Sequence, residues 1–487
     1  MSMSAEDKGK FIGMLGISLC LLAAASGWIF MRFGVSWSIA DLPESEHLYW
    51  IIPAYIVAEV AVIPIGAKLA DLWGCKRSLL IGPLLFIIGS MLATVSFNVE
   101  MLVVFRVIEG LGGGFILGYA FTAVGKYYEP TKRNVPHELM TGVFAVGSLL
   151  GSAVGYFFTD NFGWRSGFII LSLLVLLGVF LAWKYLPEHE GTGKPIDKVN
   201  LLIVMALFGV AAYYTQAVNS QYHLISVPSL IVVAIIVALL VLLMVHSRKT
   251  SDPIIPVHIS AFEKKLIVLM FLFSMCGLGL IQYFFKLYLI YYEFDIYHAS
   301  FYFILLILGA AGPSVIGCRK VMTMGVKPWV TIGAVIVTIA LVMTHFIASQ
   351  GTLQFGLSLF VFGFGLGMIV TEIIISLQGI TPRRDMGQHT GNLMAVRMIG
   401  ILIGNAVVGT YINEVIHDNR ASDIINYSTT DNLVVEIGRH LSNSIQNASD
   451  ALCDGFLTTV FIMAVVTLVL AVIAYTLRDY DLKNRSE

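Results

Sequence analysis

Long apolar runs, separated by short polar or turn-rich breaks, follow one another along almost the whole chain. A helix needs about 20 mostly apolar residues to cross a membrane, and fourteen runs reach that length. No segment alternates apolar and polar residues over a comparable distance, so helices are predicted throughout. The predicted spans are 11–32, 48–70, 78–97, 99–124, 137–159, 165–186, 199–219, 224–246, 264–291, 299–318, 327–348, 354–378, 388–414 and 454–477.

The distribution of lysine and arginine tests this count independently, because loops on the cytoplasmic side of a membrane retain basic residues. With the N-terminus placed inside, 23 of the 30 basic residues fall in inside segments or at the inside ends of spans, three fall outside, and the other four lie within predicted spans. One miscounted span would invert this bias from that point onward, and the bias never inverts. The sequence therefore predicts fourteen transmembrane helices and two cytoplasmic termini, in a multi-pass protein of the plasma or inner membrane.

Polar segments divide the predicted helices into groups. The inside segments 187–198 and 247–263 bracket the seventh and eighth spans and leave six spans on either side. A third polar stretch, about 415–453, is predicted to be an extracellular loop. The predicted domains are an N-terminal six-helix bundle at 1–190, linkers with the inserted helix pair at 191–257, and a C-terminal six-helix bundle at 258–487.

The composition agrees with a membrane protein and excludes several other classes. Hydrophobic residues make up 57% of the 487 positions and charged residues only 13%, against about 25% charged residues in a soluble domain. This excludes a soluble enzyme and a disordered chain, and the net charge of −1 gives no reason to expect nucleic acid. Five scattered cysteines without CxxC spacing argue against disulfides or a zinc site, and no phosphate-binding loop for ATP is present. We therefore expect no metal, no cofactor and no catalytic residue.

The loop after the second span carries the most specific motif. It reads Gly66-Ala-Lys-Leu-Ala-Asp71-Leu-Trp-Gly74-Cys-Lys76-Arg77, with an acid at a helix end followed by a tight turn and two bases. Such an acid can accept hydrogen bonds from free backbone N–H groups, and the bases can bind anionic lipid or pair with acids. The motif resembles the signature loop of the major facilitator superfamily. The resemblance implies that Asp71, Gly74, Lys76 and Arg77 form a gating loop.

Further motifs lie before and after this loop. Trp50-Ile-Ile-Pro-Ala-Tyr55 precedes it, and Arg106-Val-Ile-Glu-Gly110, Gly163-Trp164-Arg165, Gly317-Cys-Arg-Lys and Thr381-Pro-Arg-Arg-Asp385-Met-Gly387 follow it in order. Together they resemble the fourteen-helix drug:proton antiporter family. The resemblance implies the major facilitator fold, an all-α integral membrane protein. In it, two six-helix bundles surround a central cavity, the seventh and eighth helices are an inserted pair, and access alternates by rocking. The first span departs from the family, since it lacks the usual intramembrane Asp and carries Arg32 instead.

Seven ionisable residues within the predicted spans form the candidate site. A charge at membrane depth costs at least ~2.5–3.5 kcal/mol, so each is expected to face a cavity or a partner. Near a helix end, as for Arg32, the side chain can instead reach the interface. The candidates for the proton and substrate site are Glu109, Arg106, Glu59, Glu372, Arg397, Lys286 and Arg32.

Arg106 and Glu109 are the first candidates, because their i, i+3 spacing places them on one helix face. They form either a static ion pair or a proton site in which arginine and desolvation act oppositely on the carboxylate. In the family that the chain resembles, the arginine of this motif is implicated in proton coupling. Glu59 and Glu372 are either further sites or buried partners of the basic residues.

These features lead to one favoured function and two alternatives. The favoured function is a proton-coupled secondary transporter that exports an amphipathic small molecule, a drug or a metabolite, by alternating access. The first alternative is a proton symporter for uptake of an organic anion such as a carboxylate or a siderophore, since bases balance acids in the candidate site. A membrane-embedded enzyme or sensor is disfavoured, because no nucleophile or metal-ligand cluster is recognisable. We expect a small-molecule substrate and membrane lipid as partners, no nucleic acid, and a monomer.

Overall fold

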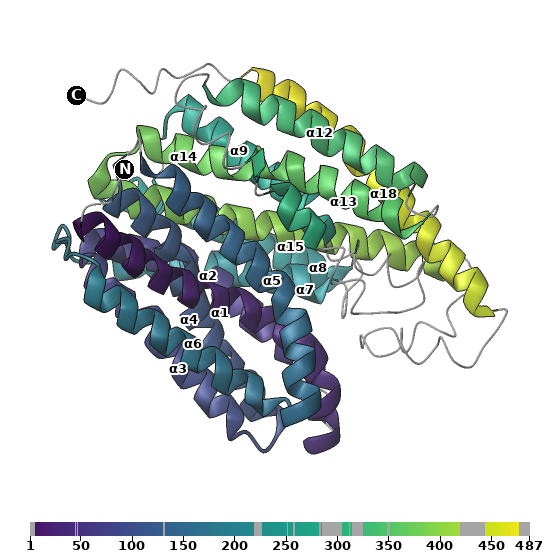
Figure 1. Ribbon diagram of the computed structural model, residues 1–487, viewed down its shortest axis with the longest axis horizontal. Helices are drawn as coiled ribbons and strands as arrows, with labels where there is room; N and C mark the ends of the chain where they lie inside the picture. Colours follow the sequence, from purple (N-terminus) through teal and green to yellow (C-terminus); the bar gives the residue numbers. More distant parts are fainter. Residues whose placement is uncertain are drawn as a thin grey trace. The chain divides into compact units, whose positions relative to one another are not determined.

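The computed structural model describes residues 5–43, 45, 47–129, 132–218, 226–250, 252–256, 259–281, 284, 304–310, 312–313, 325–347, 351–418 and 444–476. Within these ranges every regular element is a helix (Figure 1). Contacts between Cα atoms divide the chain into two compact units.

The first unit consists of Met1–Tyr213, Leu230–Ser260 and Ile374–Val396. The last range contains the later residues of α14 (Val370–Ile380) and the first residues of α15 (Met386–Asp418). The other helices of this unit are α1 (Ala5–Asp41), α2 (Ile51–Leu72), α3 (Cys75–Thr94), α4 (Val99–Tyr127), α5 (Asn134–Phe162), α6 (Arg165–Tyr185), most of α7 (Lys198–Ala217) and most of α8 (Val227–Ser247).

Close packing of α2 against α4 forms the centre of the first unit. The two helices touch through glycines of α4, spaced so that they lie on one face. A Cβ atom at Gly114 would overlap the carbonyl oxygen of Glu59, and one at Gly118 would overlap that of Ile63. Small residues let two helix backbones approach closely in this way. Helix α1 packs on α5 and α6, and α3 packs on α4 and α6.

The second unit consists of Tyr214–Ser229, Ala261–Ile373 and Arg397–Glu487. Its described helices include α9 (Ala261–Cys276), α12 (Val326–Ile347), α13 (Thr352–Gly367) and α18 (Ser444–Tyr475). Helix α12 packs on α13 and on α18, which runs beside it (Figure 1). The N–H groups of Met368 and Ile369 bond three residues back, to Gly365 and Leu366. Such tight turns commonly end helices, and here one separates α13 from α14.

The predicted all-α membrane fold is confirmed. Each of the fourteen predicted spans overlaps a helix in the described part of the chain, the tenth only at 304–310 and 312–313. Eleven described segments are long and apolar enough to cross a membrane. The count of fourteen stays a prediction, as do the domain boundaries at 190 and 257. The twelfth span, predicted as one helix, consists of α13 and α14.

Candidate functional site

Arg106 and Glu109 form an ion pair inside the first unit. The Nη1 atom of Arg106 lies 2.7 Å from Oε2 of Glu109, and both side chains are fully buried. Ser90 of α3 donates a hydrogen bond to the other carboxylate oxygen at 2.8 Å. Arg106 also donates to the carbonyl oxygens of Gly27 at 2.8 Å and Ile51 at 3.3 Å. The pair therefore joins α1, α2, α3 and α4, with a donor on each carboxylate oxygen.

Glu59 is buried in the same unit but has fewer polar contacts. It lies in α2, one turn after Tyr55, and is 1% exposed. Its Oε2 atom has no hydrogen-bond partner among the described residues. The other oxygen points at α4, where a Cβ atom on Gly113 would lie 3.5 Å from it. Glu59 is thus a buried carboxyl group with one oxygen that no described residue bonds.

The remaining intramembrane candidates lie elsewhere. Glu372 in α14 and Arg397 in α15 are buried in the second unit. Lys286 lies outside the described residues, and Arg32 lies in α1 among residues whose side chains the structure does not describe. A role for any of these four residues stays a prediction.

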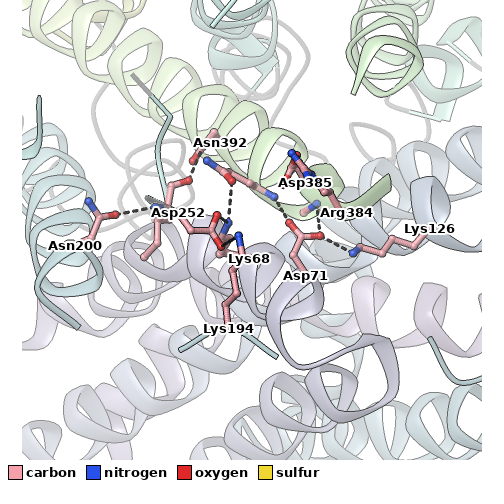
Figure 2. A network of polar contacts seen from close by, with 12 residues as sticks. Lys68, Asp71, Lys126, Lys194, Asn200, Asp252, Arg384, Asp385 and Asn392 are labelled. Carbon is pink, nitrogen blue, oxygen red and sulfur yellow. Dashed lines mark hydrogen bonds and ion pairs between the residues drawn. The ribbon is translucent and has the colours of Figure 1, made fainter. Parts of the chain in front are cut away.

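The signature loop, residues 66–77, places Asp71 against the start of α15 (Figure 2). Oδ1 of Asp71 accepts a hydrogen bond from the backbone N–H of Gly387 at 2.9 Å, and Oδ2 accepts one from Gln388 at 2.8 Å. The Nζ atom of Lys126 in α4 lies 2.6 Å from Oδ1. The first N–H groups of a helix have no partner within the helix and carry partial positive charge. Asp71 neutralises both this helix end and Lys126, and we call the arrangement the Asp71 cap.

The other predicted residues of the loop have separate positions. Gly74 has φ +90° between α2 and α3, a conformation that favours glycine. Lys76 is partly exposed, with its Nζ atom 5.5 Å from the centre of the Trp183 ring, and Arg77 is exposed. The bases of the motif therefore do not pair with Asp71. The gating role of all four residues stays a prediction.

A second acid, Asp252, contacts the same region and was not among the predicted site residues. Its Oδ1 atom lies 2.6 Å from Nζ of Lys68, whose side chain is 3% exposed. The same Nζ atom donates to the side-chain oxygen of Gln388 at 2.8 Å (Figure 2). Lys194, which is 57% exposed, lies 3.4 Å from the other oxygen of Asp252. Partial burial raises the pKa of Asp252, but the hydrogen bond and charge of Lys68, helped by Lys194, outweigh burial and hold the pKa below its usual range.

A third cluster surrounds Gln378, near the end of α14. Its side-chain nitrogen donates to the carbonyl oxygen of Phe121 at 3.0 Å and to Thr390 at 3.1 Å. Its side-chain oxygen lies 2.7 Å from Nε2 of His137. Arg133 donates to the backbone carbonyl of Gln378 at 2.8 Å. The segment 374–396 is therefore bound to α4 and to the start of α5 as well as to α2.

Comparison with known proteins decides the family. The family model described as Major Facilitator Superfamily matches residues 9–405. The chain belongs to the major facilitator superfamily. The predicted family and fold are thereby confirmed, and the protein is a multi-pass membrane protein in a family of transporters.

Two relatives and one solved structure illustrate the similarity. Multidrug resistance protein 3 of Bacillus subtilis (strain 168) is 28% identical over 247 residues, which are 50% of this chain and 48% of that protein. Multidrug transporter protein MdtP of the same organism is 22% identical over 434 residues, which are 85% of this chain and 77% of that protein. The match thus spans about half the length of the first relative. The crystal structure of the human organic anion transporter MFSD10 (TETRAN) has a TM-score of 0.61 and 14% identity, covers 95% of this chain and 100% of that chain, and shows the shared fold.

The polar contacts of the signature loop in this major facilitator protein include residues that the sequence analysis did not predict. Read along the chain, Lys126 and Asp252 are ordinary charged residues of inside segments, and Lys68 lies at the inside end of the second predicted span. One signal was available for Lys68, which follows three apolar or small residues in the last turns of the second predicted span. A lysine in such a position is seldom fully buried unless it is paired. The identity of its partner, 184 residues away, had no signal in the spacing.

Proposed function

We propose that the chain is a proton-coupled secondary exporter of amphipathic small molecules, drugs or metabolites, which works by alternating access. It acts as a monomer in the plasma or inner membrane, with both termini in the cytoplasm and the proton gradient as its energy source. Membership of the major facilitator superfamily and the multidrug names of the two relatives support this proposal.

The observation that carries the proposed proton coupling is the buried carboxylate of Glu59, whose Oε2 atom has no hydrogen-bond partner among the described residues. Leaving a buried charge without a partner is costly, and a carboxyl group avoids this cost by binding a proton. Glu109 already has a cation on one oxygen and a hydroxyl donor on the other. In the proposed cycle Glu59 is protonated while it is buried, and it releases the proton when the conformational change admits water.

The Asp71 cap supplies the proposed gate on the cytoplasmic side. It holds the first turn of α15 on α2 through two backbone hydrogen bonds, and an ion pair joins the same carboxylate to Lys126 of α4. The two hydrogen bonds connect residues more than 300 positions apart in sequence. In the proposed cycle they break when the cytoplasmic side opens and form again when it closes.

Reconstitution into liposomes tests the proposal, with the dye ethidium as the probe. An imposed pH gradient should drive ethidium against its concentration gradient and opposite to the proton flow, and a protonophore should abolish this movement. Glu59→Gln should lose gradient-driven movement while retaining exchange of ethidium down its own gradient. Glu109→Gln is the matched control, because it makes the same change at another buried glutamate of the same unit. It should retain gradient-driven movement of ethidium.

Two outcomes would contradict this assignment. Normal gradient-driven transport by Glu59→Gln, with loss in Glu109→Gln, would transfer the proton site to the Arg106–Glu109 pair. Movement of a probe in the same direction as protons would replace export with the symport alternative.

A further inference from the structure

The predicted inserted pair, α7 and α8, is attached to the signature loop through the segment that precedes it. The backbone N–H of Thr192 donates to the carbonyl oxygen of Asp71 at 2.8 Å, and that of Gly193 donates to Leu72 at 3.0 Å. In the opposite direction, the N–H of Cys75 donates to the carbonyl oxygen of His189 at 3.1 Å. The chain that enters α7 therefore runs along the turn that carries Asp71.

The segment that leaves α8 is bound at two adjacent places. Asp252 pairs with the buried Lys68 of α2. Two residues later, the backbone N–H of Ile254 donates to the side chain of Asn200 in α7 at 2.8 Å, and its carbonyl oxygen accepts from Asn392 in α15 at 3.1 Å. Figure 2 shows these contacts beside the Asp71 cap. The connecting segment thus lies between the start of α7 and the start of α15.

Gln388 connects the two acids. Its backbone N–H donates to Asp71, while its side-chain oxygen accepts from Lys68, which Asp252 holds in place. Asn392 lies four residues further on, so it shares a face of α15 with Gln388. The first two turns of α15 are therefore held by the inserted pair as well as by the signature loop.

We propose that Asp252, Lys68 and Gln388 form a second gate contact, the Asp252 clasp, through which the inserted helix pair restrains the start of α15 during the transport cycle. This inference rests on the proposed function. Lys68 and Asp252 are positioning residues: they act on transport by holding Gln388, and the clasp opens together with the Asp71 cap. The inserted pair is then part of the gate rather than a lipid-facing addition to it.

Lys68 and Asp252 differ in exposure, and this difference predicts which of two substitutions has the larger effect. Neutralising Asp252 would leave the ammonium group of Lys68 buried without a counter-charge, which is strongly unfavourable. Removing Lys68 instead leaves Asp252, which is 19% exposed, beside solvent and Lys194. The change at Asp252 should therefore have the larger effect. Lys194→Met is the matched control, because this exposed lysine contacts the same carboxylate and exposed ion pairs contribute little.

Hydrogen–deuterium exchange of the full chain in lipid nanodiscs tests the clasp without any transport. We expect Asp252→Asn to speed exchange in peptides covering 385–393 by about tenfold, as for loss of one charged hydrogen bond. Lys68→Met should give a smaller increase, and the double variant should exchange no faster than Asp252→Asn. Lys194→Met should stay within about twofold of the unmodified protein. Unchanged exchange at 385–393 in Asp252→Asn, or an equal increase throughout α6, would overturn the proposal.

Transport of ethidium by the same variants separates gating from a merely structural role. Asp252→Asn should change the maximal rate at least fivefold while KM stays within about twofold, as expected when the interaction affects the conformational step. Exchanging the charges, Lys68→Asp with Asp252→Lys, should restore at least half of the unmodified rate. A change confined to KM, or no rescue by the exchanged pair, would contradict the clasp. Failure of gradient-driven transport in the unmodified protein would overturn the proposed function alone, because the exchange measurement needs no substrate.

Discussion

The Arg106–Glu109 pair and the Asp71 cap are both buried ion pairs in the first unit, but they join different kinds of neighbours. Arg106 and Glu109 lie three residues apart on one helix, and their further partners belong to α1, α2 and α3. Asp71 joins α2 to Lys126 and to backbone groups of residues more than 300 positions later. The first arrangement fixes helices within a bundle. The second ends on the first turn of a helix whose later residues belong to the other unit.

This difference suggests which interactions stay closed during transport. Arg106 has three separate hydrogen-bond acceptors, and its guanidinium carbon lies 4.4 Å from the centre of the Tyr55 ring. Opening this pair would expose several unsatisfied polar groups at once. The Asp71 cap can open at lower cost if water reaches it, since water can bind both the carboxylate and the helix end.

The largest expected effect is the loss of stability when Arg106 is replaced. Arg106→Leu leaves Glu109 as an uncompensated buried charge and removes donors from two carbonyl oxygens, so it should lower the free energy of unfolding by about 3–5 kcal/mol. Denaturant unfolding of the purified protein in detergent measures this change. Glu109→Gln, which preserves the shape and one acceptor, should cost less and keeps the test usable if Arg106→Leu does not fold. If both variants changed the free energy of unfolding by equal and small amounts, the Arg106–Glu109 pair would contribute no more to stability than the Asp71 cap does.

A smaller effect is expected at Asp71, and mainly on transport. Asp71→Asn keeps one acceptor for α15 but leaves Lys126, which is 9% exposed, without its counter-charge. The maximal transport rate should fall about tenfold, equivalent to ~1.4 kcal/mol, while KM changes by less than about twofold. The control is Asp385→Asn, since the carboxylate of Asp385, in the network of Figure 2, accepts a hydrogen bond from the adjacent exposed Arg384 at 3.1 Å. A change in KM alone would argue against a gating role for the cap.

The smallest effect is expected at Asp197, which lies just before α7. Its carboxylate accepts from the backbone N–H groups of Val199 at 2.9 Å and Asn200 at 3.0 Å, and from Thr250 at 2.8 Å. Asp197→Ala should therefore destabilise the start of α7 by about 1 kcal/mol, as for loss of a helix cap. Amide exchange at the start of α7 measures this loss.

The pH dependence of the same cap provides a second measurement. Slight burial opposes the shift, but these hydrogen bonds and that to His246 lower the pKa of Asp197 to about 2. An unfolded Asp has a pKa of about 3.9, so the stabilisation is complete above that pH and is lost as the pH falls through about 2. Exchange in Asp197→Ala should lack this loss between about pH 4 and pH 2. The same acid-induced loss in that variant would assign the effect to another group.

The sequence predicted local features of this molecule better than distant contacts. The helical spans follow from apolar run length, and the Arg106–Glu109 contact follows from i, i+3 spacing on one helix. Lys126 and Asp252 carry no comparable signal, because their partners depend on how helices pack in three dimensions. The sequence signal for the division between α13 and α14 is the glycine run Gly363-Phe-Gly365-Leu-Gly367, because glycine weakens a helix at such a position. The sequence left open whether Glu59 is a further site or a buried partner of a basic residue. The structure adds that its Oε2 atom has no hydrogen-bond donor among the described residues, and its role stays a prediction.

Glu59, Lys68 and Asp71 all lie on α2, whose backbone touches α4 at Gly114 and Gly118. Twelve residues of helix separate Glu59 from Asp71, a distance of about 18 Å along the axis. A movement of α2 would therefore shift the carboxylate of Glu59 and the residues of both proposed gate contacts together, with no relay of side chains between them. We expect any larger residue at Gly114 or Gly118 to push α2 away from α4 and to impair transport even though every ionisable group remains in place.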